Sequence, residues 1–288
     1  MNSGLGNFVM NDTSAPSKPS RLFTAVNAVG CIVVNTISYI GGMVYMAVDL
    51  FSWVIRALLG RKIRFGREAL YIQIVRVGIR SIGIICLVSL CIGLILVLQM
   101  APPLTEFGQT DKVANVNAVA IIRELGPLIS AIVLTGFAGA SIAAELGTMV
   151  VGEEIEALES MALNPVRFLV VPRVLASIVG LIVLAVFADV VALSSGAVVG
   201  IGLLDIAPGV YWSNTLEQAK MIDFITGLLK AGVFGMLIGL IACYNGLKVT
   251  GGAAGVGRAT TTTVVHAIVS IICADLVFTA LFYVLGWT

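Results

Sequence analysis

A stretch of twenty-five residues without a charged side chain, residues 81–105, limits what this chain can fold into. As an α-helix with a rise of about 1.5 Å per residue, it is long enough to cross the roughly 30 Å hydrocarbon core of a membrane. Four further apolar stretches have comparable length: 118–145, 174–204, 222–246 and 264–287. Only 11% of the residues are charged, against about a quarter in soluble proteins. The sequence therefore predicts an all-α membrane protein with five transmembrane helices.

The basic residues predict the orientation of these spans, because lysine and arginine gather in cytoplasmic loops. With the N-terminus inside, thirteen basic residues lie on the cytoplasmic side: Lys18, Arg21, Arg56, Arg61, Lys62, Arg64, Arg67, Arg76, Arg80, Arg167, Arg173, Lys248 and Arg258. Three lie on or near the outside, namely Lys112, Arg123 and Lys220. The predicted topology has a cytoplasmic N-terminus and an external C-terminus.

The region before residue 81 is less regular. Residues 1–21 are polar, lack the pattern of a signal peptide and are expected to form a disordered cytoplasmic tail. Residues 22–80 are expected to form a helical elbow, in which residues 22–59 are apolar but interrupted by polar side chains and followed by a basic cluster. We favour an amphipathic helix in the inner-leaflet interface for residues 22–59. The alternative is a sixth span.

Several functions find no support in the sequence. A net charge of +1 gives no reason to expect a nucleic-acid partner. The five cysteines stand singly in apolar runs, which favours inert buried thiols over metal ligands or disulfides. The chain has no GxxxxGK[ST] motif and so no ATPase site, and the glycine-rich residues 251–257 follow no strand. We interpret them as a tight cytoplasmic turn and expect the chain to bind no cofactor.

An acidic segment joins the second and third spans. Glu153, Glu154, Glu156 and Glu159 alternate with Ile155, Leu158 and Met161, which is the spacing of a short amphipathic helix. Asn164 before Pro165 is expected to end this helix. Such a helix on the cytoplasmic side could dock on another protein, or it could be a solvated loop helix.

The same segment, residues 145–176, is similar to one in a known family. Four more stretches match it in order and spacing: IGLILVLQM (92–100), IIRELGPLISAIVLTG (121–136), IACYNGL (241–247) and GGAAGVGRATTTTVV (251–265). From about residue 65 to its end, the chain resembles the MlaE/YrbE family, the permeases of MCE-type ABC transporters. Members of this family commonly have Gly-Arg-x-Gly where this chain has Gly136, Phe137, Ala138 and Gly139.

The resemblance implies a bacterial inner-membrane homodimer whose residues 81–288 form the permease domain. It implies two cytoplasmic ATPase subunits that use ATP and Mg, an MCE protein, in many systems a STAS-domain partner, and a phospholipid substrate. Transport between the inner membrane and the MCE protein would maintain the lipid asymmetry of the outer membrane. The coupling helix would lie in residues 145–165, with Glu145, Gly147, Glu153, Glu154, Ile155, Leu158, Glu159, Met161 and Pro165 as candidate contacts of the ATPase.

Charged residues within the spans are costly and are therefore candidates for function. We expect a lipid cavity lined by Leu98, Gln99, Arg123, Glu124 and Pro127, with Glu124 facing the dimer cavity; a structural pair with a neighbouring loop is the alternative. Asp189, Lys230 and Asp275 lie at comparable depths in three spans. We expect them to be structural, with Lys230 paired to Asp189 or Asp275.

Two other functions were weighed. An intramembrane serine protease would use Ser141, in Gly139-Ala140-Ser141, with His266, but Ile142 replaces the final glycine of the motif. A secondary transporter would favour inverted repeats, and the five predicted spans do not divide into equal halves. A copurifying ATPase would separate the permease from both.

Overall fold

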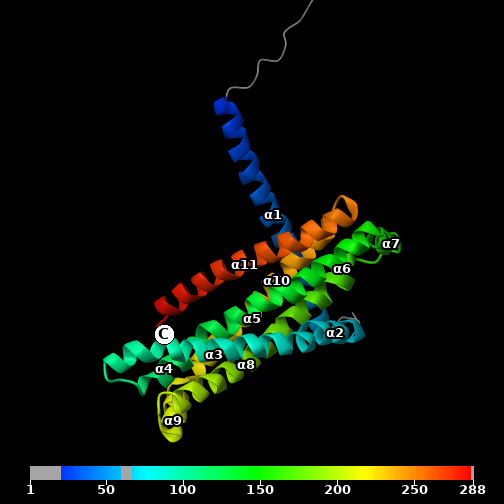
Figure 1. Ribbon diagram of the computed structural model, residues 1–288. Helices are drawn as coiled ribbons and strands as arrows, with labels where there is room; N and C mark the ends of the chain where they lie inside the picture. Colours follow the sequence, from blue (N-terminus) through cyan, green and yellow to red (C-terminus); the bar gives the residue numbers. More distant parts are fainter. Residues whose placement is uncertain (1–20, 60–66, 287–288) are drawn as a thin grey trace, which may run out of the picture. The chain divides into compact units, whose positions relative to one another are not determined.

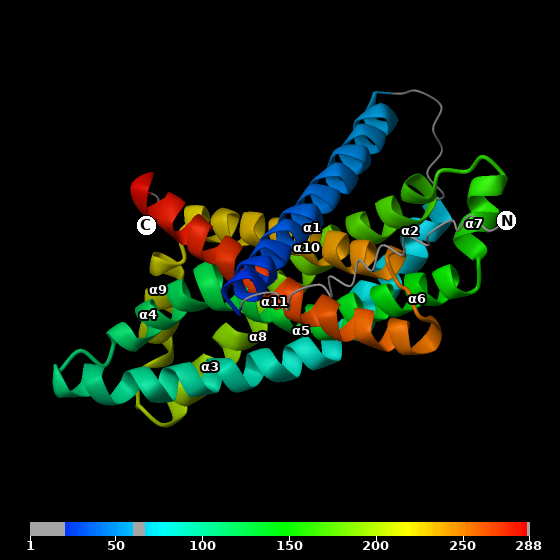
Figure 2. The same ribbon diagram turned by 90° about the horizontal axis from the view of Figure 1, so that it is seen from above.

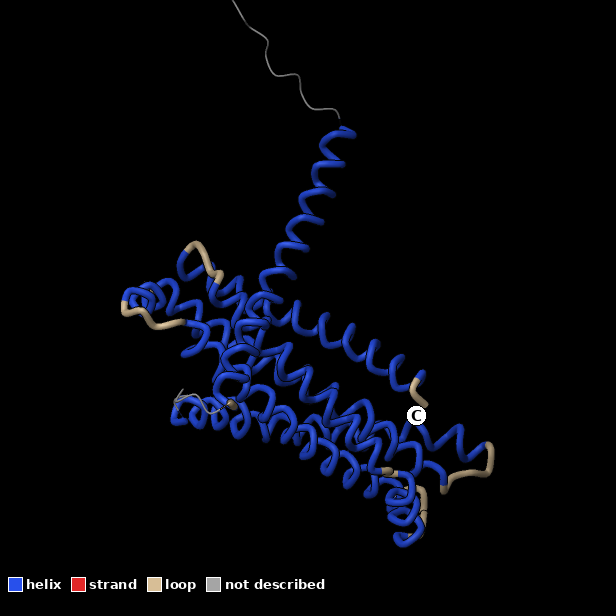
Figure 3. Tube along the Cα trace, turned by 180° about the vertical axis from the view of Figure 1, so that it is seen from behind, coloured by secondary structure: helices blue, strands red, loops and turns tan. Residues whose placement is uncertain are grey.

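The computed structural model describes residues 21–59 and 67–286, and every regular element within them is a helix (Figure 3). The predicted tail lies outside the described residues except for Arg21, and so does the basic cluster of residues 61–64. The helices are α1 (Arg21–Leu58), α2 (Arg67–Ile74), α3 (Arg80–Glu106), α4 (Lys112–Ala120), α5 (Gly126–Leu134), α6 (Ala140–Val151), α7 (Glu154–Ser160), α8 (Val171–Gly202), α9 (Pro208–Gln218), α10 (Met221–Leu247) and α11 (Gly252–Val284). Four π-helical turns interrupt them: η1 (Val75–Ile79), η2 (Ile121–Leu125), η3 (Thr135–Gly139) and η4 (Val166–Val170).

The chain divides into two units within α1. The first unit ends at Val44, and its described part is the first half of α1. The second unit, Tyr45–Thr288, contains the other helices. Within it, α2, α6 and α7 lie at one end of the bundle and α4 and α9 at the other (Figures 1 and 2). We call these the α7 end and the α9 end.

Six helical segments in the described residues are long and apolar enough to cross a membrane. Five coincide with the predicted spans: Leu70–Glu106, Lys112–Val151, Val166–Gly202, Met221–Leu247 and Gly252–Val284. Two of these helices end before the predicted span does, at Gly202 instead of residue 204 and at Val284 instead of residue 287. The sixth, Val33–Arg56, falls in the region for which the sequence left a span and an interfacial helix open. Its side chains include many exposed apolar groups, such as Ile37, Val48 and Phe51, which suit contact with lipid.

Small residues let α8 and α10 approach closely. Gly235 and Gly239, one turn apart on α10, are buried and face Ser177 and Val174 of α8. A Cβ atom on Gly235 would lie 2.6 Å from the carbonyl oxygen of Ser177 on α8, so no larger residue fits without separating the helices. Close contact through small residues is the usual way in which helices pack in a membrane, where no hydrophobic effect drives them together.

Two element boundaries differ from the sequence prediction. The acidic helix α7 ends at Ser160, before Ala162 takes a left-handed conformation with φ of 58°. Asn164 does not end it but begins the next helix, because its side-chain oxygen accepts a hydrogen bond of 2.8 Å from the backbone N–H of Val166.

The predicted turn at residues 251–257 is mostly helical. α11 begins at Gly252, immediately after Gly251 with φ of 86°, so only the first glycine belongs to the turn. The threonines that follow do not break the helix, since the hydroxyl groups of Thr260 and Thr261 donate hydrogen bonds to the carbonyl oxygen of Gly257.

Candidate functional site

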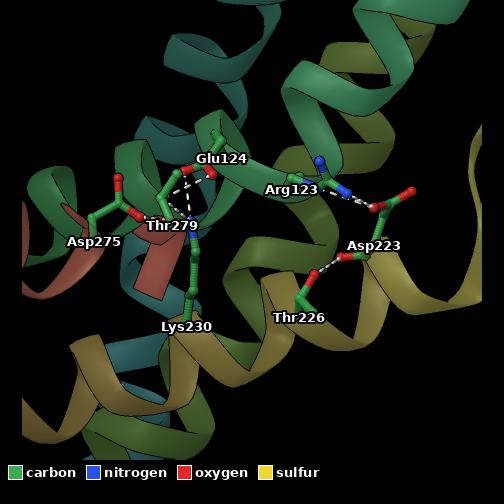
Figure 4. A network of polar contacts seen from close by, with 7 residues as sticks. All are labelled: Arg123, Glu124, Asp223, Thr226, Lys230, Asp275 and Thr279. Atoms are coloured by element: carbon green, nitrogen blue, oxygen red, sulfur yellow. Dashed lines mark hydrogen bonds and ion pairs between the residues drawn. The ribbon is translucent and has the colours of Figure 1, made fainter. Parts of the chain in front are cut away.

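A buried lysine joins three spans near the α9 end. The side chain of Lys230 on α10 has no exposed surface, and its ammonium group lies 2.6 Å from Glu124 Oε2 and 2.8 Å from Asp275 Oδ1 (Figure 4). It also donates to the hydroxyl of Thr279 at 3.1 Å, and Thr279 donates to Glu124 Oε1. The three protons of the ammonium group therefore have three acceptors, as a charge buried in a membrane protein requires. We call these four side chains the Lys230 cluster.

The π-helical turn η2 and a glycine bring the two sides of this cluster together. Gly227 lies one turn before Lys230 on α10, and a Cβ atom there would lie 2.3 Å from the carbonyl oxygen of Ile122. The backbone of η2 thus rests directly on α10. Glu124, two residues after Ile122, is thereby held within hydrogen-bonding distance of Lys230.

A second ion pair ties η2 to the start of α10. Arg123 donates from Nε and Nη2 to Asp223 Oδ1, at 3.0 and 2.7 Å (Figure 4). The Asp223 side chain is only 4% exposed. Adjacent residues of η2 therefore contact positions seven residues apart on one face of α10, and the two pairs fix the helices against each other.

The predicted pairing of Lys230 is confirmed for Asp275. Asp189 lies instead against the backbone of Gly126 on α5, where a Cβ atom would lie 1.7 Å from Asp189 Oδ1. Position along the span had suggested the right depth for Asp189 but says nothing about the direction in which its side chain points.

The Lys230 cluster and the Arg123–Asp223 pair contain partners that the sequence did not predict. The Glu124 carboxylate accepts hydrogen bonds from Lys230 and Thr279, which lie on neighbouring helices and not in a loop. Its side chain is still 30% exposed, and its place in a dimer cavity stays a prediction. The spacing of Asp223, Gly227 and Lys230 places the three residues on one helix face, so it could have indicated that Asp223 faces the same neighbouring helix as Lys230. No sequence pattern indicated that Thr279 would contact Lys230.

The five predicted cavity residues do not line one site within the chain. Leu98 and Gln99 on α3 are exposed, whereas Pro127 is buried and packs near Gly227. Arg123 and Glu124 are held in the two ion pairs described above. That a second copy of the chain completes a lipid cavity around these residues stays a prediction.

A different network lies toward the α7 end. Glu145 on α6 pairs with Arg76 of η1 at 2.5 Å and with Arg173 of α8 at 2.9 Å. Arg173 is only 5% exposed and also donates to the carbonyl oxygen of Leu169. Glu145, predicted as a coupling residue, thus bridges helices of its own chain. Gly147, predicted with it, packs against Val249.

The acidic helix α7, the predicted coupling element, is largely exposed. Glu153, Glu154, Glu159 and Met161 are exposed, whereas Ile155 and Leu158 are half-buried. Pro165, half-buried, precedes η4. The amphipathic pattern read from the sequence is therefore present over the seven residues of α7, and the acidic face is available.

The pattern of an intramembrane protease has no counterpart around Ser141. Ser141 is exposed at the start of α6 and lines a cavity with Arg76 and Arg80. His266 is not among the residues that line it.

Comparison with protein families decides between these possibilities. The family described as "Permease MlaE" matches residues 70–281, from α2 almost to the end of α11. The chain belongs to the MlaE permease family. The match covers well over half of the chain, and the family named from the sequence motifs is confirmed.

Relatives of this MlaE-family chain occur in bacteria and in a plant. A probable ABC transporter permease protein of Rickettsia conorii, RC0129, is 34% identical over 262 residues, which are 91% of this chain and 99% of the relative. The intermembrane phospholipid transport system permease protein MlaE of Haemophilus influenzae is 31% identical, over 88% of this chain and the whole relative. The chloroplastic protein TRIGALACTOSYLDIACYLGLYCEROL 1 of Arabidopsis thaliana is 34% identical over 73% of this chain and 60% of its own length.

Proposed function

We propose that this MlaE-family chain is the membrane subunit of an ATP-driven transporter that moves phospholipid between the inner membrane and an MCE protein, and so maintains outer-membrane lipid asymmetry. The observation that carries the proposal is the family match along residues 70–281, together with a relative in Haemophilus influenzae named as an intermembrane phospholipid transport permease. Permeases of this kind are membrane subunits, and ATP and Mg would be used by a separate cytoplasmic ATPase dimer.

Three features of the structure support this proposal. The exposed acidic helix α7 lies at one end of the bundle and offers a surface for the ATPase. The Lys230 cluster lies toward the opposite end and connects three spans by ion pairs. A displacement of α6 and α7 would therefore be transmitted to the other spans through helices that are bound to one another. α11 has few buried residues along its 33-residue length, which leaves its outer face for lipid or for the second copy of a homodimer. A STAS-domain partner belongs to the same proposal.

Orientation gives a first test. With α7 in the cytoplasm and five spans, the N-terminus lies inside and the C-terminus outside, as the distribution of basic residues predicts. Single cysteines placed at residues 2 and 288, in a variant without the native cysteines, should differ in their reaction with a membrane-impermeant maleimide in intact cells: protected at 2 and labelled at 288. Labelling of both termini would favour six spans, because a span formed by α1 would place the N-terminus outside as well, and would contradict the interfacial placement of α1.

The function itself is tested by purification and transfer. Affinity purification in mild detergent should recover an ATPase, an MCE-domain protein and phospholipid, identified by mass spectrometry. The reconstituted complex should transfer labelled phospholipid to the MCE protein only with ATP and Mg. Transfer driven by an ion gradient without any ATPase would instead establish a secondary transporter.

A further inference from the structure

A cavity of about 470 Å³ lies beside the Arg76–Glu145 ion pair, far along the bundle from the Lys230 cluster. One wall is formed by η1 and the start of α3, with Arg76 and Arg80 one helical turn apart. The facing wall is formed by η3 and α6, with Phe137, Ser141 and Glu145 on one helical face. The volume falls in the range of small-molecule sites in proteins, about 300–1,000 Å³.

The walls of this cavity carry more positive than negative charge. Glu145 is the one carboxylate among the lining residues, and it is shared between Arg76 and the buried Arg173. In the part of the chain that the structure describes, no carboxylate pairs with Arg80, which is exposed. The guanidinium of Arg80 is therefore available to an anionic ligand.

The position of Arg80 indicates where that ligand comes from. Arg80 immediately precedes the charge-free residues 81–105, which are long enough to fill the hydrocarbon core. It therefore stands at the boundary between hydrocarbon and headgroups, at the end of the bundle where α7 lies. Phe137, 38% exposed, adds an apolar surface to the same cavity.

We propose that this cavity binds the phosphate group of a phospholipid headgroup in the leaflet at the α7 end, with Arg80 as the main ligand. A guanidinium group can donate two parallel hydrogen bonds to a phosphate. Arg76, already fixed by Glu145, adds positive charge, and the Ser141 hydroxyl adds a donor. The proposal rests on the proposed transport function only for the choice of a lipid as the source of the phosphate.

Phe137 lies across the cavity from Arg80. The two side chains belong to different helical segments, η3 and α3, and both line the cavity. A guanidinium group can thus reach the same space from either wall. In this chain Arg80 supplies the charge that the phenylalanine does not.

The test measures lipid binding to the purified, delipidated full chain by native mass spectrometry, with phosphatidylglycerol as the probe. Arg80→Gln should weaken binding about tenfold or more, as expected for the loss of a charge-assisted hydrogen bond. Arg80→Lys should retain part of the affinity, because the charge remains without the planar fork. Adding Phe137→Arg to Arg80→Gln should restore binding. Diacylglycerol with the same acyl chains should bind weakly to every form.

Controls separate this site from general effects. Arg258→Gln removes an exposed arginine from α11 outside the cavity and should leave binding unchanged. Ser141→Trp should block the cavity without changing its charge and should also abolish binding. Equal affinities of the unaltered chain and Arg80→Gln would overturn the site. Displacement of the lipid by millimolar inorganic phosphate would overturn the lipid assignment and make a soluble phosphate ester the ligand. Binding without ATP-driven transfer would instead count against the proposed function alone.

Discussion

Lys230→Met should sharply lower the yield of folded protein. The substitution removes the cation that lies within 2.8 Å of both Glu124 and Asp275 and leaves two carboxylates together among three helices. Removing one partner of a buried ion pair costs about 3–5 kcal/mol, comparable with the whole stability of many domains. The measurement is the amount of monodisperse protein after extraction from the membrane, together with its thermal unfolding midpoint.

Matched variants identify the cause. Lys220→Met removes an exposed lysine at the start of the same helix and should have little effect. Adding Asp275→Asn to Lys230→Met should partly restore the yield, and adding Glu124→Gln as well should restore more, because fewer uncompensated charges remain. Asp189→Asn should restore nothing, since Asp189 lies against Gly126. If Lys230→Met and Lys220→Met gave the same yield, the cluster would have no structural role.

Reversal of charge at Glu153 and Glu154 should abolish transport without preventing insertion. Both side chains are exposed at the beginning of α7, and neither belongs to an ion pair recorded in the described residues. Lysines at both positions would replace attraction for a basic partner surface by repulsion, and close charge pairs across interfaces are worth about 1.5–7 kcal/mol. The expected result is loss of ATPase copurification and of ATP-dependent lipid transfer.

The matched control makes the same change of charge at the α9 end. Glu106→Lys with Glu217→Lys alters two exposed glutamates remote from α7 and should leave the ATPase bound. A charge-reversed α7 that still copurified an active ATPase would contradict its assignment as the coupling helix. In both variants the amount of protein in the membrane is measured first.

The helices were predictable from the sequence because length and lack of charge determine what can cross a bilayer. Each of the five predicted spans coincides with an observed helical segment, although 174–204 and 264–287 run past the observed ends at Gly202 and Val284. The last helix begins at Gly252, twelve residues before the apolar stretch at 264. That start was missed because the glycine-rich residues 251–257 were interpreted as a turn, whereas α11 already begins at Gly252. Thr260 and Thr261 continue the helix, since their hydroxyl groups donate to the carbonyl oxygen of Gly257. Composition alone does not decide whether Val33–Arg56 crosses the membrane or lies in its interface.

The candidate site was only partly predictable, for a geometric reason. Counting residues along a span gives depth, and depth correctly suggested Asp275 as a partner of Lys230. The direction of a side chain around the helix axis depends on phase, and the π-helical turn η2 changes the phase at Glu124. The α-helical periodicity of the sequence therefore could not show that Glu124 points toward Lys230. The pairing of Glu145 with both Arg76 and Arg173 depends on contacts across 69 and 28 residues, which no local pattern contains.

The second predicted span is a helix interrupted by two π-helical turns. η2 and η3 bound the nine residues of α5, the first turn holding Glu124 of the Lys230 cluster and the second holding Phe137 of the cavity wall. A π-helical turn accommodates one extra residue, and a residue that such a turn passes when it shifts along the chain is rotated by about 100° around the helix axis. A shift of η2 or η3 would therefore change the direction of single side chains beside it, such as Glu124 or Phe137, without opening the helix. The two π-helical turns therefore add rotation around the helix axis, besides tilting of the helix, to the motions open to this span.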